Sequence, residues 1–212
     1  MQDIAELVEG YRRFLSNRYR QEAELYRALG ETGQSPKTMV IACCDSRIDP
    51  AAIFSAGPGE LFVVRNVANL VPPFEPPGDY HGTSAALEFA VGGLGVENIL
   101  VMGHAKCGGV RAHLDGVYRR SDQSSFIDNW MSLLNAASAE ALRDCGEEPL
   151  EVQQRALEHA SIRNSIENLK TFPFITERLA EGQLRLRGAY FDISNGILLA
   201  LDPDKGEFEP LS

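Results

Sequence analysis

The chain has 212 residues, of which 44% are hydrophobic and 24% are charged, a composition typical of globular proteins. Its formal net charge of −10 argues against nucleic acid and anionic membranes as partners, because both would repel the protein. We expect neither a secretory signal nor a membrane-spanning segment, and therefore a cytoplasmic location.

The first predicted element is a long amphipathic helix. Apolar residues recur at helical spacing over residues 3–29, with charged residues between them. Gly30 and Gly33 then mark its end. Residues 1–33 are thus predicted to form a helical arm, whose apolar face needs a surface to cover.

Short apolar runs alternate with helical patterns over the rest of the chain. Buried strands are predicted at residues 37–44, 61–67 and 98–103, a strand near a sheet edge at 184–191, and a last strand at 197–201. Helices are predicted at residues 82–94, 108–114, 124–141, 149–170 and 173–180. This alternation favours an α/β fold with a mostly parallel central sheet flanked by helices. We expect one domain over residues 1–212, with its catalytic core at 37–201.

Two polar clusters follow two of the predicted strands. The first runs Cys43-Cys44-Asp45-Ser46-Arg47, and the second contains His104, Cys107, Gly108 and Gly109. Ligands of open α/β sheets bind beyond the carboxyl ends of the strands, so the two clusters can face one site. Two thiolates and one imidazole, from Cys43, Cys107 and His104, form a ligand set that suits Zn²⁺. Three protein ligands leave one tetrahedral position open, which is typical of a catalytic zinc site.

The other cysteines are weaker candidates for a fourth ligand. Cys44 should point to the opposite face of its strand from Cys43, and Cys145 lies in a distant polar stretch. A vicinal pair, Cys43 and Cys44, leaves open a non-catalytic zinc-binding or thiol redox-sensing protein. Taken singly, Cys43 and Cys107 are also compatible with buried core thiols.

Two spaced motifs relate the chain to a known family. Cys-x-Asp-Ser-Arg at residues 43–47 and His-x-x-Cys-Gly-Gly at residues 104–109 together resemble the β-class carbonic anhydrases, and the likeness extends over Lys37 to Leu201. The resemblance implies reversible hydration of CO2 to bicarbonate, with one Zn²⁺ per subunit. It also implies a homodimer or tetramer in which the N-terminal arm is exchanged between subunits. Some relatives hydrolyse carbon disulfide or carbonyl sulfide on the same fold, and the ligand set does not separate these substrates.

The resemblance also implies roles for the residues around the zinc ligands. Asp45 accepts a hydrogen bond from zinc-bound water, and Arg47 fixes the Asp45 carboxylate and keeps it ionised. If Arg47 releases it, Asp45 becomes a fourth metal ligand and the site closes. Ser46, Gly108 and Gly109 are expected to border the substrate or to support the ligands.

Three further positions bear on the choice between open and closed forms. Relatives that close and bind regulatory bicarbonate carry a Trp three positions before the first Cys, a Tyr in a late glycine-aromatic segment, and an Arg as the third pocket residue. This chain has Val40 at the first position and Phe191 at the second, with Tyr190 as the alternative alignment, and it has Arg65 at the third. We therefore predict an open site with water on zinc.

Overall fold

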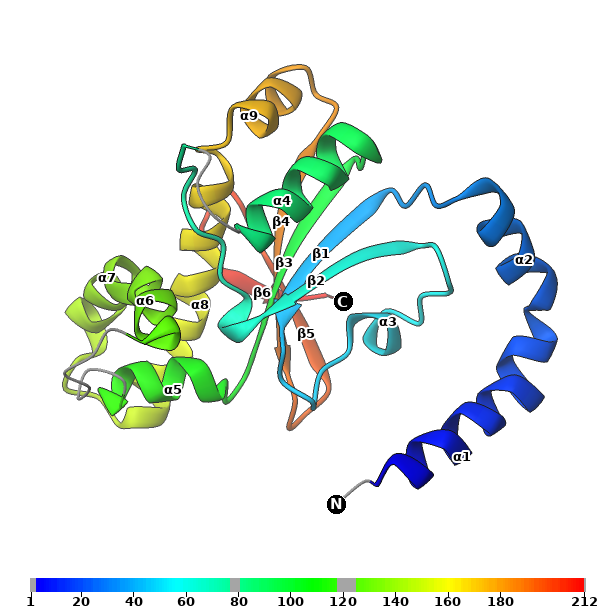
Figure 1. The fold of residues 1–212 in the computed structure, drawn as a ribbon. Coiled ribbons are helices and arrows are strands. Elements are labelled where there is room, and N and C mark those ends of the chain that lie inside the picture. The colour runs from blue at the N-terminus through cyan, green and yellow to red at the C-terminus, as the bar shows by residue number, and fades with distance from the viewer. Residues whose placement is uncertain (1–2, 77–80, 118–124, 212) are drawn as a thin grey trace.

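Six strands form a mixed sheet at the centre of the protein, within residues 3–76, 81–117 and 125–211 that this computed structural model describes (Figure 1). The strands are β1 (Thr38–Cys43), β2 (Leu61–Asn66), β3 (Asn98–His104), β4 (Arg185–Asp192), β5 (Ile197–Leu201) and β6 (Phe208–Pro210). Their order is β2-β1-β3-β4-β5-β6, with parallel pairing from β2 to β4 and antiparallel pairing from β4 to β6. The predicted α/β fold is confirmed.

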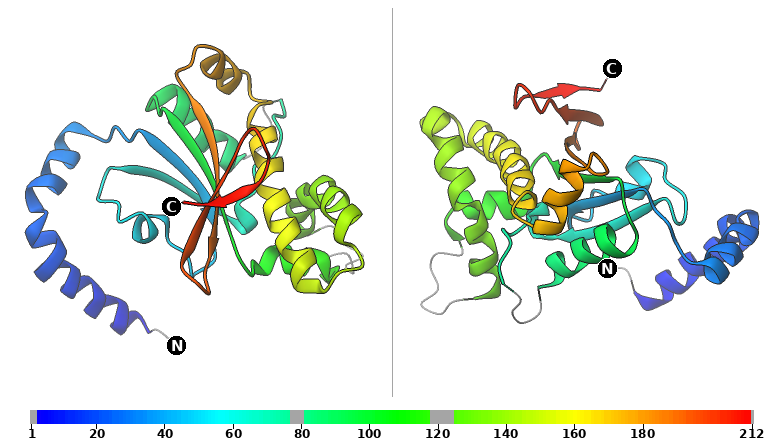
Figure 2. Two further views of the ribbon diagram at one scale, coloured as in Figure 1. Left: turned by 180° about the vertical axis from the view of Figure 1, so that it is seen from behind. Right: turned by 90° about the horizontal axis from the view of Figure 1, so that it is seen from above.

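Helices flank the sheet (Figure 2). Two apolar clusters are buried between the helices and the sheet. After the arm they are α3 (Pro50–Ile53), α4 (Gly82–Glu88), α5 (Gly108–Leu114), α6 (Phe126–Met131), α7 (Asn135–Cys145), α8 (Leu150–Leu169) and α9 (Pro173–Ala180). Single helical turns or π-helical segments are η2 (Val67–Asn69), η3 (Phe89–Gly93) and η5 (Ser132–Leu134). Along β1, Met39 and Ile41 join the cluster beneath α4 and α9, whereas Val40 and Ala42 join the cluster beneath α5 to α7. Alternate side chains of a strand point to opposite faces, so β1 is buried on both sides.

The N-terminal arm extends away from the sheet (Figures 1 and 2). It consists of α1 (Ile4–Phe14), the π-helical segment η1 (Leu15–Tyr19) and α2 (Ala23–Thr32), rather than one continuous helix as predicted. No residue of these three segments is buried. The amphipathic pattern is real, but its apolar face still needs a surface to cover. In the described part of the chain, no helix is both long enough and apolar enough to cross a membrane.

Three local predictions differ from the structure. The helix predicted at 124–141 is divided into α6, η5 and α7 and continues to Cys145, while residue 124 lies outside the described residues. Strand β4 is not at the sheet edge, because it pairs with both β3 and β5. Its exposed arginines misled the prediction: they lie in the first half of β4, whereas β5 pairs with Ala189–Asp192. The short strand β6 was not predicted.

Helix α8 lies close to β3 and β4. A Cβ atom at Gly103 would lie 2.7 Å from Cδ1 of Ile162, and one at Gly188 would lie 3.0 Å from Cγ2 of the same residue. Glycine at both positions therefore lets the backbone of α8 approach the sheet. This approach brings polar residues of α8 to the ends of the strands.

One of those residues, His159, is enclosed by aromatic rings. Its ring centroid lies 4.4 Å from that of Tyr190 and 4.3 Å from that of Phe208 in β6. Its Nε2 atom has no hydrogen-bond partner among the described residues. Burial, together with the charges of Arg163 and Arg155, lowers the pKa of His159 to about 4. The folded protein therefore holds this imidazole neutral.

We expect His159 to make the protein acid-sensitive. An unfolded-state imidazole titrates near 6.5, so between that pH and about 4 the unfolded chain binds more protons than the folded protein. Stability is therefore lost as the pH falls through this window. Between about pH 7.5 and pH 5, the unfolding free energy of the His159→Phe variant should therefore fall by about 2 kcal/mol less than that of the unmodified protein. Urea unfolding of both proteins at both pH values measures this difference; an equal loss in the variant contradicts the assignment.

Candidate metal centre

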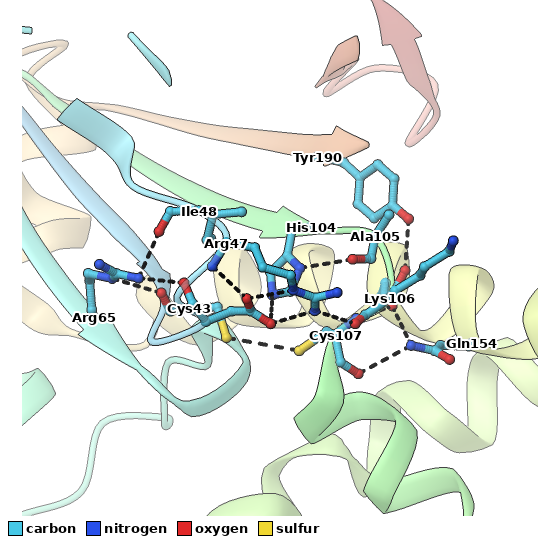
Figure 3. Close-up of polar contacts among 12 residues, drawn as sticks. Cys43, Arg47, Ile48, Arg65, His104, Ala105, Lys106, Cys107, Gln154 and Tyr190 are labelled. Atoms are coloured by element: carbon cyan, nitrogen blue, oxygen red, sulfur yellow. Dashed lines mark hydrogen bonds and ion pairs between the residues drawn. The ribbon is translucent and has the colours of Figure 1, made fainter. Parts of the chain in front are cut away.

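Three potential metal ligands converge where β1 and β3 end (Figure 3). Cys43 is the last residue of β1, His104 is the last residue of β3, and Cys107 caps the start of α5. The two Sγ atoms lie 4.0 Å apart, and with a ring nitrogen of His104 they form a group whose atoms are all within 4.8 Å of one another. All three residues are buried. Parallel pairing of β1 with β3 explains how motifs so far apart in sequence meet.

The imidazole of His104 presents a free lone pair to this group. Its Nδ1 atom lies 2.9 Å from the carbonyl oxygen of Ala105, which can only accept, so Nδ1 carries the ring proton. The Nε2 atom is buried and has no hydrogen-bond partner among the described residues. Binding a metal through Nε2 needs this tautomer, in which Nδ1 donates its proton to a backbone carbonyl and so fixes the ring.

The thiols of Cys43 and Cys107 share a hydrogen bond that shifts their pKa values in opposite directions. A hydrogen bond from Cys107 lowers the pKa of Cys43 to about 4, despite the opposing effect of burial. The same hydrogen bond and burial raise the pKa of Cys107 far above its ordinary value. One proton is therefore lost readily, while the second is retained between the sulfurs. A divalent ion with an affinity for sulfur and nitrogen can replace that proton, so these residues fit a metal ion.

Backbone N–H groups support both sulfurs. Those of Asp45 and Ala68 lower the pKa of Cys43, and those of Val110 and Gly109 act in the same direction on Cys107. Ala68 has a left-handed backbone with φ of 63°. A Cβ at Gly109 would lie 3.0 Å from Val67, so glycine lets α5 begin against η2. The exposed Gly108 opens the same helix.

Asp45 faces the ligand group but is bound to Arg47. The Arg47 guanidinium donates to both carboxylate oxygens, at 2.9 and 2.6 Å, and the Arg47 backbone N–H donates to Oδ1 at 2.9 Å. These bonds hold the pKa of Asp45 far below its ordinary value. Its Oδ2 atom lies 3.9 Å from Nε2 of His104. Arg47 also donates to the carbonyl of Lys106 at 2.9 Å, which ties the two motif loops together. Ser46 is exposed in the turn between the pair.

The structure adds a buried carboxylate that the sequence analysis missed. Glu158 of α8 accepts hydrogen bonds at Oε1 from the backbone N–H of Cys107 and the side chain of Gln154, both at 2.8 Å. Its Oε2 accepts from the hydroxyl of Tyr190 at 2.7 Å. Burial raises the pKa of Glu158. A glutamate within a helix ordinarily faces solvent, so no sequence signal distinguishes this one.

The remaining cysteines stay apart from the group. Cys44 is exposed, and Cys145, at the end of α7, donates to the carbonyl of Ala141 at 3.0 Å. Within the described ranges, Cys43, His104 and Cys107 form the set with a metal-ligand arrangement.

Comparisons with known proteins agree with this geometry. A family described as "Carbonic anhydrase" matches residues 38–198. "Beta carbonic anhydrase 3" of Arabidopsis thaliana is 35% identical over 198 residues, which cover 91% of this chain and 74% of that protein. "Beta carbonic anhydrase 5, chloroplastic" of the same plant is 41% identical, and the match covers 84% of this chain and 58% of the relative.

Solved structures show the same fold. The structure described as that of "the beta-carbonic anhydrase CcaA" has a TM-score of 0.90, 29% identity, and coverage of 98% of both chains. A structure of tetrameric β-carbonic anhydrases from Sordaria macrospora has a TM-score of 0.78, 25% identity, and covers 99% of this chain and 96% of that one. The chain belongs to the β-class carbonic anhydrase family.

Proposed function

We propose that this protein catalyses the reversible hydration of CO2 to bicarbonate and a proton, with one zinc ion per chain held by Cys43, His104 and Cys107. The observation that carries the proposal is the Asp45 carboxylate, which faces this group and is held by Arg47. A purely structural metal site has no need of such a pair. When bound, zinc supplies Lewis acidity, which makes a hydroxide nucleophile available near neutral pH.

Asp45 and Arg47 orient the reactants in this proposal. The ionised Asp45 carboxylate can only accept a hydrogen bond, so it accepts one from the attacking oxygen and turns a lone pair of that oxygen toward CO2. Arg47 keeps the carboxylate ionised and limits its rotation, because it binds both oxygens. We assign Ser46 and Gly108 to the border of the substrate site. Gly109 supports Cys107 through its backbone N–H.

We also propose that the site is open, with Asp45 on Arg47 rather than on the metal. Three hydrogen bonds from Arg47 to the carboxylate support this arrangement. Val40 and Phe191, where relatives that close carry Trp and Tyr, support it as well. In the closed alternative, Asp45 would be the fourth metal ligand.

The exposed apolar face of the N-terminal arm bears on self-association. Ile4, Leu7 and Tyr11 on α1 are 75%, 59% and 58% exposed, an arrangement that needs an apolar partner surface. The Sordaria macrospora relative is described as tetrameric. We therefore propose a homodimer or tetramer in which the arm covers a second subunit. We also propose that the arm and the core belong to one domain. The cytoplasmic location stays a prediction, because names of relatives include chloroplastic and mitochondrial forms.

Stopped-flow CO2 hydration with a pH indicator tests the activity directly. The zinc-loaded protein should accelerate hydration, and a chelator should abolish the acceleration until zinc is restored. Asp45→Ala should lower the rate about 100-fold or more while one zinc per chain is retained, because the orienting acceptor is lost. The matched control, Asp204→Ala in an exposed turn, should leave the rate unchanged. Full activity in Asp45→Ala contradicts the mechanism, and sulfide release from carbon disulfide or carbonyl sulfide without CO2 hydration contradicts the substrate.

Analytical ultracentrifugation tests the role of the arm. Deleting residues 1–29, or introducing Leu7→Glu together with Tyr11→Glu, should lower the oligomer mass because the apolar face of α1 is lost or charged. The control, Glu6→Gln with Glu9→Gln, keeps that apolar face and should sediment as the unmodified protein does. An unchanged oligomer after deletion counts against arm exchange.

A further inference from the structure

Arg65 binds the loop that carries the first metal-site motif. It lies on β2 opposite Ala42 of β1, so its side chain reaches the carboxyl end of β1. Its Nε donates to the carbonyl of Cys43 at 2.9 Å, and its Nη2 donates to the carbonyls of Asp45 and Ile48, both at 2.7 Å (Figure 3). One guanidinium thus holds three carbonyls within six consecutive residues.

These bonds use most of what the guanidinium can donate. The single N–H at Nε and both N–H groups at Nη2 are engaged, while Nη1 lies 3.7 Å from the carboxylate of Asp49. Arg65 is therefore committed to the protein backbone. A planar fork with five donors can span several carbonyls, whereas a lysine ammonium offers its donors at a single point.

The loop that Arg65 holds determines where Asp45 points. Further backbone ties are a bond from Cys44 N–H to the Asn66 carbonyl at 2.9 Å and one from Ile48 N–H to the Asp45 carbonyl at 3.2 Å. Arg65 fixes the carbonyls on both sides of the Asp45 side chain, so it restricts the backbone rotation that would redirect the carboxylate. That restriction matters because Oδ2 of Asp45 is already only 3.9 Å from Nε2 of His104. A loop movement toward His104 would bring the carboxylate within reach of a metal ion held by Cys43, His104 and Cys107.

We propose that Arg65 is a positioning residue that keeps the Asp45 carboxylate on Arg47 and off the metal. The inference rests on the proposed zinc site but concerns a different residue, which touches neither the metal ligand atoms nor the substrate. Loss of Arg65 frees the loop, Asp45 takes the fourth coordination position, and exogenous ligands are excluded from it. A residue that merely stabilised the fold would lower the melting temperature without changing access to the metal.

Azide binding to the cobalt-substituted protein, followed by its visible spectrum, tests this inference. If Asp45 occupies the metal in about nine of ten Arg65→Gln molecules, the apparent azide affinity falls about tenfold. Arg65→Lys, a milder change in case the Gln variant folds poorly, should show a smaller loss. The control is Arg163→Lys, because Arg163 also donates to a backbone carbonyl, that of Gly206, but away from the site. It should keep the affinity of the unmodified protein.

The double variant separates positioning from general damage. In an Asp45→Asn background, Arg65→Gln should cause no further loss of azide affinity, because the competing carboxylate is absent. Equal losses with and without the Asp45 carboxylate overturn the inference, as does a lowered melting temperature with unchanged azide affinity in Arg65→Gln. Failure of the unmodified protein to bind cobalt or azide would instead overturn the proposed metal site.

Discussion

Two buried sulfur atoms 4.0 Å apart are the constraint on which the site depends. Removing both thiol protons would place two negative charges close together in a poorly hydrated interior, which is unfavourable without a cation. His104 directs its Nδ1 proton to the Ala105 carbonyl, so the lone pair of its Nε2 atom is the one available to a metal ion. The three groups are therefore complementary to a metal ion, and an ion bound there would link the ends of β1 and β3 to the start of α5.

Several polar side chains around this group form hydrogen bonds with backbone atoms of the segments that carry the ligands. Arg65 binds three carbonyls of the first loop, Arg47 binds the Lys106 carbonyl of the second, and Glu158 binds the Cys107 N–H. Each contact fixes a ligand-bearing segment from a neighbouring strand, loop or helix. A metal site assembled from loops needs such support, because the ligand geometry is only as precise as the loops that present it. Gly103 and Gly188 contribute indirectly, by letting α8 bring Glu158 close enough.

Much of this organisation follows from local sequence patterns, whereas the supporting contacts do not. Buried parallel strands appear as continuous apolar runs, so β1, β2 and β3 were predictable, and polar motifs at their ends indicated a site. The ligand chemistry of Cys43, His104 and Cys107 suggested a zinc site, whereas the roles of Asp45 and Arg47 came only from the family resemblance. Glu158 was missed because its burial depends on how α8 packs, which no local pattern encodes. The segmented arm and β6 were missed because a π-helical turn and a three-residue strand leave little periodic signal.

We have proposed that this chain holds zinc and that the Asp45–Arg47 pair leaves one coordination position open. A crystal structure of the zinc-loaded protein at neutral pH, with the metal located by its anomalous scattering, would decide this. We expect zinc bound by Cys43, His104 and Cys107, a non-protein fourth ligand, and Asp45 on Arg47. Zinc with the Asp45 carboxylate as its fourth ligand, or zinc bound elsewhere, would contradict the proposal.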